Sequence, residues 1–139
     1  MVNPEKVEGL LEKLRQYVSQ LNELKKLSKT DLIKNFANIN SAKYLFQTAI
    51  ECCLDLGNHI ISSEGFRAPA DYKDIFKVLN ENRIIPEEFL DTAVSMAKFR
   101  NRLVHLYWDV DENMVYEFLQ NNLAYFDEFV KYILNYIKK

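Results

Sequence analysis

The feature that most constrains the fold is an apolar stripe of helical period near the start of the chain. Hydrophobic side chains recur there at spacings of three and four residues, which places them on one face of a helix with about 3.6 residues per turn. They are Val7, Leu10, Leu11, Leu14, Tyr17, Val18, Leu21 and Leu24. Asn3 followed by Pro4 is a typical helix start, so the stripe predicts a helix from Pro4 to about Lys26.

The same period continues and predicts a long helix in the middle of the chain. Ser28 and Asp31 form a capping pattern ahead of a short helical piece, which residues 38–41 are expected to interrupt. From Ala42 to Ile61 the chain is apolar over more than half of the helical circumference. Such a helix is covered on several sides, so we expect it to be the central one.

The second half of the chain predicts three more helices. Residues 65–70 form a loop by their Gly and Pro, and Asp71 then opens a short helix. Pro86 begins the next helix, which is expected to end near Val104. An Asp-x-x-Glu box starting at Asp109 precedes a final helix of about seven turns.

Composition favours an all-α fold. Three Gly and three Pro in 139 residues leave little material for tight turns. We therefore predict an up-and-down helical bundle of four long helices and one or two short ones, as a single domain over residues 1–139. The formal net charge of −2 argues against a protein whose whole surface binds nucleic acid, because phosphate binding needs clustered Lys and Arg. A local basic patch remains compatible with this charge.

The cysteines and the hydropathy indicate a cytoplasmic protein. Cys52 and Cys53 are adjacent in sequence, so on a helix they are poorly placed to bridge each other, and they are expected as small buried apolar side chains. No window has the uncharged apolar length that a membrane span needs, so no membrane contact is expected. A metal site built with His59 and His105 would match no standard zinc spacing, and neither a metal nor a cofactor is expected.

Polar residues on the central helix are candidates for a supporting role. Asp55, Asn58 and His59 lie at i, i+3 and i+4, and hence on one face. One interpretation is an internal hydrogen-bonded cluster, because buried polar groups are almost always paired. The other is that Asp55 or His59 supports a site on another helix.

The stretch 98–108 carries the residues best suited to chemistry. Arg100 can grip phosphate oxygens, and His105 can exchange a proton near neutral pH, which are the parts of a metal-free ribonuclease. On a continuous helix the two would lie about 140° apart, so convergence needs the helix to fray after Val104 or a second chain to contribute. Asn101 is expected to hold the His105 imidazole, and Tyr107 to share a face with Arg100. The structural alternative is an arginine near a helix C-terminus and an ordinary interhelical histidine.

The spacing Arg-x4-His-x-Tyr at Arg100, His105 and Tyr107 resembles the motif of the HEPN-domain toxins of the HepT type. Residues 54–61 and 65–69 also look like signature segments of that family, so the resemblance covers most of the chain. Leu106 departs from the family pattern, which often has glycine at this position.

The resemblance implies an all-α homodimer in which two motifs face each other across a cleft and cut RNA without a metal. Arg100 and His105 would be catalytic, with Asn101 in support. A small nucleotidyltransferase antitoxin would silence the toxin by transferring AMP from ATP to Tyr107. The alternative is a non-catalytic helical module that binds a nucleotide or the nucleotidyltransferase. Trp108 is expected in the core or at a dimer contact.

Overall fold

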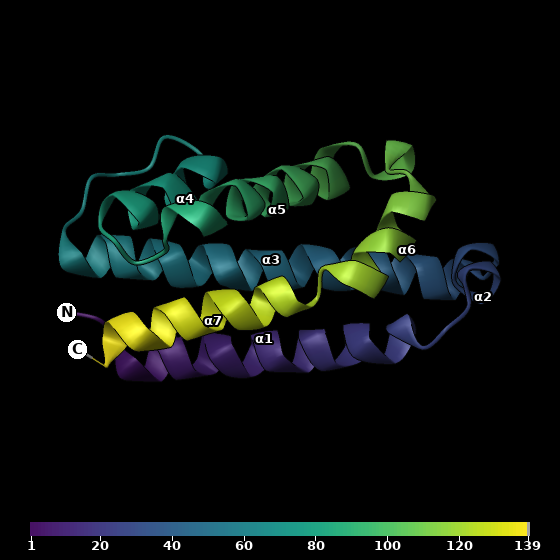
Figure 1. Ribbon diagram of the computed structural model, residues 1–139, viewed down its shortest axis with the longest axis horizontal. Helices are drawn as coiled ribbons and strands as arrows, with labels where there is room; N and C mark the ends of the chain where they lie inside the picture. The colour runs from purple at the N-terminus through teal and green to yellow at the C-terminus, as the bar shows by residue number, and fades with distance from the viewer. Residues whose placement is uncertain (139) are drawn as a thin grey trace.

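All regular elements of the computed structural model are helices within the residues that it describes, 1–138 (Figure 1). In chain order they are α1 (Pro4–Lys25), α2 (Lys29–Lys34), α3 (Phe36–Glu64), α4 (Tyr72–Glu81), α5 (Glu87–His105), the short 3-10 helix η1 (Tyr107–Asp109), α6 (Glu112–Asn121) and α7 (Ala124–Ile137). The all-α prediction is confirmed.

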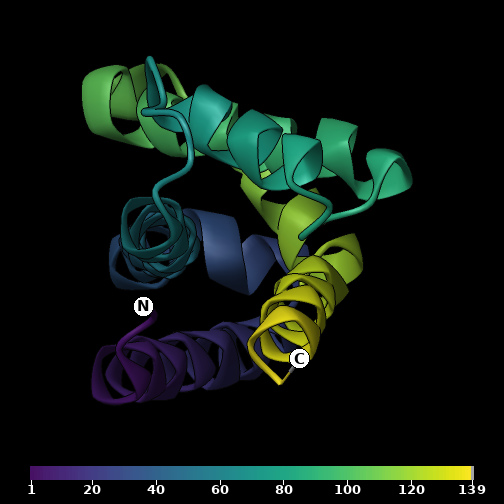
Figure 2. The same cartoon turned by 90° about the vertical axis from the view of Figure 1, so that its left-hand side faces the viewer.

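Helix α3 runs through the middle of the molecule. In Figure 1, α1 and α7 lie below it and α4 and α5 lie above it, and the end-on view in Figure 2 shows the same two groups on opposite sides. Contacts of α3 with α1, α2, α4, α5, α6 and α7 bear this out. The predicted central helix is therefore covered on several sides, as its broad apolar surface requires.

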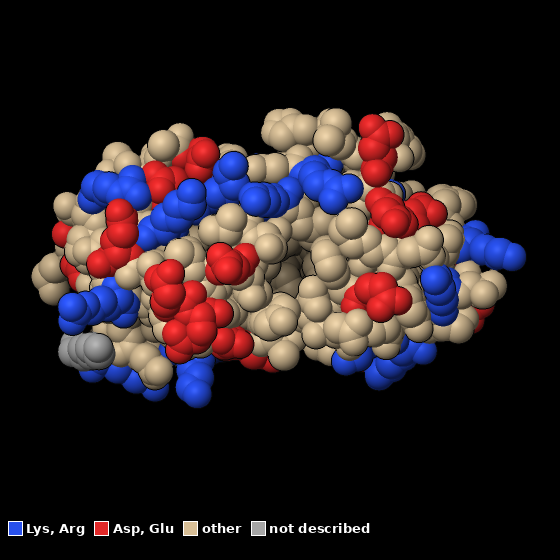
Figure 3. Space-filling view, turned by 45° about the horizontal axis from the view of Figure 1, so that its top comes forward, with Lys and Arg blue, Asp and Glu red and all other residues tan. Residues whose placement is uncertain are grey.

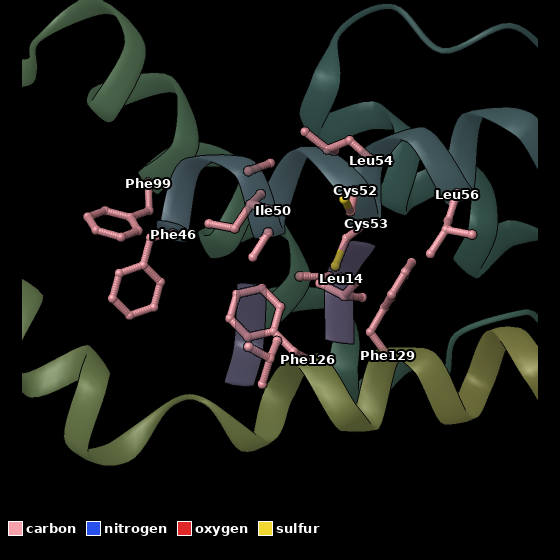
Figure 4. Packing of buried hydrophobic residues seen from close by; sticks show 14 of the residues in the cluster. Leu14, Phe46, Ile50, Cys52, Cys53, Leu54, Leu56, Phe99, Phe126 and Phe129 are labelled. Atoms are coloured by element: carbon pink, nitrogen blue, oxygen red, sulfur yellow. The ribbon is translucent and has the colours of Figure 1, made fainter. Parts of the chain in front are cut away.

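The core is one cluster of buried side chains along α3. Figure 4 shows Phe46, Ile50 and Leu56 of α3 beside aromatic side chains of α7. Cys52 and Cys53 are buried and unbridged, as expected. Burial raises the pKa of the Cys52 thiol to about 11 and that of Cys53 well above its ordinary value, so neither is a reactive thiolate at neutral pH.

Side-chain caps begin three of the helices where the sequence predicts them. The Asn3 side chain accepts hydrogen bonds from two backbone N–H groups of the first turn of α1. Ser28 accepts one in α2, and Asp71 accepts one in α4. Each cap satisfies a donor that the helix itself leaves unpaired.

Three predicted helix boundaries are wrong. Residues 38–41 do not interrupt a helix, because the break falls at Asn35, whose side chain caps α3 by accepting from the next backbone N–H groups. The final helix is divided between α6 and α7 at residues 122–123. It also begins two residues later than predicted, because Asp111, and not Asp109, is its cap.

The division of the last helix follows from where its two halves pack. Helix α6 contacts α1, α2 and α3, whereas α7 turns to lie along α1 and α3 (Figure 1). Leu123 and Phe126 are both buried in the core, and their spacing is the one that a straight helix would also show. The apolar period of the sequence therefore does not reveal the break between α6 and α7. Among residues 1–138 no helix combines the length and the apolarity that crossing a bilayer requires.

Candidate functional site

Arg100 lies where α3, α4 and α5 meet, and its side chain is only 12% exposed. The guanidinium donates to one carboxylate oxygen of Glu51 on α3, from Nε at 3.0 Å and from Nη2 at 2.6 Å. Its Nη1 donates to Asn101 Oδ1 at 3.2 Å. Charge-assisted hydrogen bonds of this kind are about twice as strong as neutral ones, so they fix the plane of the guanidinium.

The face of the guanidinium packs on an aromatic ring. The Tyr72 ring centroid lies 4.5 Å from Arg100 Cζ, within the range of a cation–π contact. Tyr72 is the first residue of α4 and follows its cap, Asp71. Its position thus depends on how the preceding loop is held.

That loop is held by a second arginine. Gly65 ends α3 in the left-handed conformation, with φ of 69°. Arg67 then donates to both carboxylate oxygens of Asp74, at 2.7 and 2.8 Å, and to Glu81. The Arg67 guanidinium and the Ala70 N–H hold the pKa of Asp74 well below its usual range. The signature segment 65–69 therefore has a structural task here, which is to fix the start of α4.

His105 is the last residue of α5, and its side chain is exposed with no hydrogen-bond partner among residues 1–138. The helix does not fray after Val104, because it includes His105 and the Leu106 N–H donates to the Arg102 carbonyl, so of the two routes to convergence only a second chain is left. Arg100 and His105 of one chain thus diverge by about 140° around α5. The expected bond between Asn101 and His105 is absent, because the Asn101 amide oxygen accepts from Arg100 instead.

Tyr107 turns back onto α3 immediately after α5 ends. Its hydroxyl donates to Asn40 Oδ1, and the Lys43 Nζ lies 4.6 Å from the ring centroid. Burial, and then the nearby Glu112 carboxylate, raise the pKa of Tyr107. The expectation that Tyr107 shares a helix face with Arg100 is wrong, because the chain leaves the helix between them.

Lys43 is nearly fully buried, which is rare for a lysine. Its ammonium lies 3.7 Å from a Glu112 carboxylate oxygen and donates to the Tyr107 carbonyl at 3.5 Å. These contacts offset the cost of removing the charge from water, and they fasten the segment after α5 to α3.

The predicted internal cluster on the central helix does not exist. Asp55 and Asn58 are exposed, and His59 Nε2 accepts the backbone N–H of Asn3 at 3.0 Å. Burial, and then the charges of Lys6 and of the chain N-terminus, lower the pKa of His59. His59 therefore supports the start of α1 and lies outside the Arg100 contacts.

The acidic residue that contacts Arg100 is Glu51, one helical turn before Asp55. Asp55 makes no hydrogen bond to Arg100, and burial followed by the Glu51 charge raises the pKa of Asp55. Sequence reasoning missed Glu51. Its only signal was the i, i+4 spacing to Asp55, which puts both carboxylates on the same face of α3.

The surface around the motif is partly apolar. Trp108 is 87% exposed, so it is not in the core, and Leu106, Val104, Tyr44 and Tyr72 are exposed as well. Lys and Arg side chains form a band across the upper part of the face in Figure 3, on the side of α4 and α5. On α5, Lys98 and Arg102 are exposed. A local basic patch on an acidic protein is consistent with this view.

Two other features lie away from the motif. A hollow of about 400 Å³ between α3, α5, α6 and α7 is lined mainly by apolar and aromatic side chains and includes neither Arg100 nor His105. Over residues 1–138, no three His, Cys, Asp or Glu side chains are grouped so that they could hold a metal ion.

Known proteins with similar sequences include nucleases. The chain is 30% identical to the mRNA nuclease HepT of Shewanella oneidensis over 63% of its own length and 65% of that protein. The match thus spans slightly less than two thirds of this relative. It is 25% identical to the tRNA nuclease HepT of Aphanizomenon flos-aquae over 98% of its own length and 92% of that protein.

Solved structures share the fold. The tri-AMPylated Shewanella oneidensis HEPN toxin in complex with MNT antitoxin superposes with a TM-score of 0.85 at 22% identity, over 93% of this chain and 96% of that one. YutE of Bacillus subtilis, a cytosolic protein of unknown function, gives a TM-score of 0.84 at 23% identity, over 99% and 92%. The family model of the HepT-like ribonucleases matches residues 10–133. The chain therefore belongs to the HepT-like ribonuclease family, as its motif predicted.

Proposed function

We propose that this protein is a metal-independent endoribonuclease and the toxin of a toxin–antitoxin pair, with Arg100 and His105 as its catalytic residues. The observation that carries the proposal is that Arg100, whose guanidinium is fixed by Glu51 and Asn101, shares α5 with His105, whose exposed imidazole has no hydrogen-bond partner among residues 1–138. The ribonuclease family and the two nuclease relatives support the reaction class.

The two residues have complementary tasks. His105 takes the proton of a ribose 2′-hydroxyl, or gives one to the leaving 5′-oxygen, as the 2′-oxygen attacks phosphorus and the bond to the 5′-oxygen breaks. Arg100 stabilises the negative charge that develops on the phosphoryl oxygens. Asn101 keeps the guanidinium in place through its amide oxygen.

A homodimer would complete the site. Because Arg100 and His105 diverge around α5, one chain presents them in different directions. His105 is flanked in sequence by three exposed apolar side chains, Val104, Leu106 and Trp108. Burying them against a second copy of the chain would be favourable. A dimer that pairs these surfaces would let a guanidinium of one protomer and an imidazole of its partner address one phosphate.

Tyr107 is the proposed acceptor of AMP from a nucleotidyltransferase antitoxin. The phenol oxygen would attack the α-phosphorus of ATP, and pyrophosphate would leave. The tri-AMPylated toxin with its bound antitoxin supports this assignment by similarity of fold. In this chain the hydroxyl donates to Asn40, so this hydrogen bond is lost when the phenol gives up its proton to solvent or to a base of the antitoxin in the transfer.

The test is incubation of the purified, unmodified protein with total cellular RNA in a metal chelator. Arg100→Ala and His105→Ala are compared with Arg83→Ala, an exposed arginine outside the motif. We expect cleavage by the wild type and by Arg83→Ala only. Cleavage that survives either motif substitution, or that requires added metal, would contradict the assignment.

A second candidate is a non-catalytic helical module that binds the nucleotidyltransferase or a nucleotide. It is favoured by one observation, the ion pair with Glu51 that already occupies one edge of Arg100. Absence of cleavage by dimeric protein whose mass shows no AMP on Tyr107 would support this candidate over the first.

A further inference from the structure

Glu51 is a half-buried carboxylate on α3 that the motif does not include, and its contacts with Arg100 bridge two helices. We propose that Glu51 is a positioning residue that orients the Arg100 guanidinium for an RNA phosphate. This inference rests on the proposed function. Under it, the reaction requires Glu51 although Glu51 lies outside the motif.

The hydrogen bonds of the guanidinium show how this orientation works. A guanidinium has five N–H groups in a rigid plane. Glu51 takes the Nε–H and one N–H of Nη2, and Asn101 takes one N–H of Nη1. One N–H on each terminal nitrogen is left. Phosphate oxygens accept from such N–H groups, so Glu51 holds one edge of Arg100 and leaves an N–H group on each terminal nitrogen for the phosphate.

The surroundings make Glu51 the main restraint on this orientation. The Tyr72 ring covers the guanidinium, but a contact of this kind does not stop the guanidinium from turning within its own plane. Asn101 is adjacent to Arg100 in sequence and makes one hydrogen bond at 3.2 Å. Glu51 makes two shorter ones from a different helix. Its charge also balances a guanidinium that is 12% exposed.

The experiment uses the full-length protein and compares Glu51→Ala and Glu51→Gln with Glu128→Gln. Glu128 is a matched control because it is also a half-buried glutamate whose carboxylate accepts a side-chain hydrogen bond, from Tyr132 on α7, outside the contacts of Arg100. The steady-state kcat and KM for cleavage of one RNA are measured. Thermal unfolding of each variant shows that it is folded.

We expect Glu51→Ala to lower kcat by about 10- to 100-fold, with a smaller change in KM, because a misoriented guanidinium loses stabilisation of the transition state. Glu51→Gln is expected to recover part of kcat, since an amide oxygen still accepts from both donors. Glu128→Gln is expected to match the wild type. Wild-type or raised kcat in Glu51→Ala would overturn the proposal.

A second measurement separates this proposal from the proposed function. The Arg100 Nε–H signal is identified in ¹⁵N–¹H spectra by its loss in Arg100→Lys. We expect slow exchange of this proton with water in the wild type and fast exchange in Glu51→Ala. If the wild type does not cut RNA, the proposed function fails, whereas an Nε–H signal unaffected by Glu51→Ala would overturn the positioning role alone.

Discussion

Removal of the Tyr107 hydroxyl tests both the structure of the motif and its regulation. Tyr107→Phe deletes the donor to Asn40 but keeps the ring that packs 4.6 Å from Lys43 Nζ. A neutral hydrogen bond contributes about 0.5–1.5 kcal/mol to the free energy of unfolding. Asn40 is half-buried, so water can replace part of the bond, and we expect a loss of about 0.5–1 kcal/mol.

Urea unfolding at pH 7 measures this loss, and Tyr116→Phe is the matched control. The Tyr116 ring also lies near a lysine, 5.9 Å from Lys29 Nζ, but its hydroxyl has no hydrogen-bond partner among residues 1–138. The control should change the midpoint little. In a double-mutant cycle with Asn40→Ala, we expect a coupling free energy of about 0.5–1 kcal/mol between Asn40 and Tyr107.

The same variant should lose the modification. When a nucleotidyltransferase antitoxin and ATP are supplied, intact mass is expected to show AMP on the wild type and on Tyr116→Phe, and none on Tyr107→Phe. A coupling free energy of zero would refute the Tyr107–Asn40 contact. An AMP adduct on Tyr107→Phe would refute the acceptor assignment, independently of the stability result.

Two further predictions concern the frame that holds the motif. Because the pKa of His59 is lowered in the folded protein, its protonation favours the unfolded state. The free energy of unfolding should therefore be greatest at pH values well above the ordinary histidine pKa, and it should fall as the pH drops through that value. Unfolding measured from neutral to mildly acidic pH should show this slope in the wild type and a smaller one in His59→Gln; equal slopes would contradict the role of His59 beside Asn3. Phe129 is fully buried and packs edge-on against Phe76, with ring centroids 5.7 Å apart, so Phe129→Ala should cost about 3–5 kcal/mol by urea unfolding. Phe36→Ala, at a side chain that is 79% exposed, should cost far less, and similar losses at both positions would be inconsistent with this core.

Local chemistry in the sequence predicts the helices well. Apolar period and caps such as Ser28 and Asp71 act within a few residues, so they can be found without the fold. The break at residues 122–123 escapes this reasoning, because Leu119, Leu123 and Phe126 keep helical spacing across it. Only the change in packing partners between α6 and α7 distinguishes two helices from one.

The site is less predictable because its contacts join distant residues. Glu51 meets Arg100 across 49 positions, and Asn40 meets Tyr107 across 67. The motif spacing predicts which side chains are reactive, but their partners depend on how α3 and α5 lie against each other. The partner of Asn101 is equally hard to predict. Either Arg100 or His105 could bond its amide, and the amide oxygen accepts from Arg100, the charged donor.

The end of α5 explains why the motif has this spacing. Arg100 faces inward, where α3 and α4 can fix it, and His105 faces outward about 1.4 turns later by the helical period. Tyr107 then returns to α3, where Asn40 and Lys43 hold it. A single chain therefore presents a fixed guanidinium and an accessible imidazole in different directions. Under the proposed function, one chain alone cannot direct both groups at one phosphate, and a second copy that brought its His105 to the Arg100 of the first would give two equivalent centres.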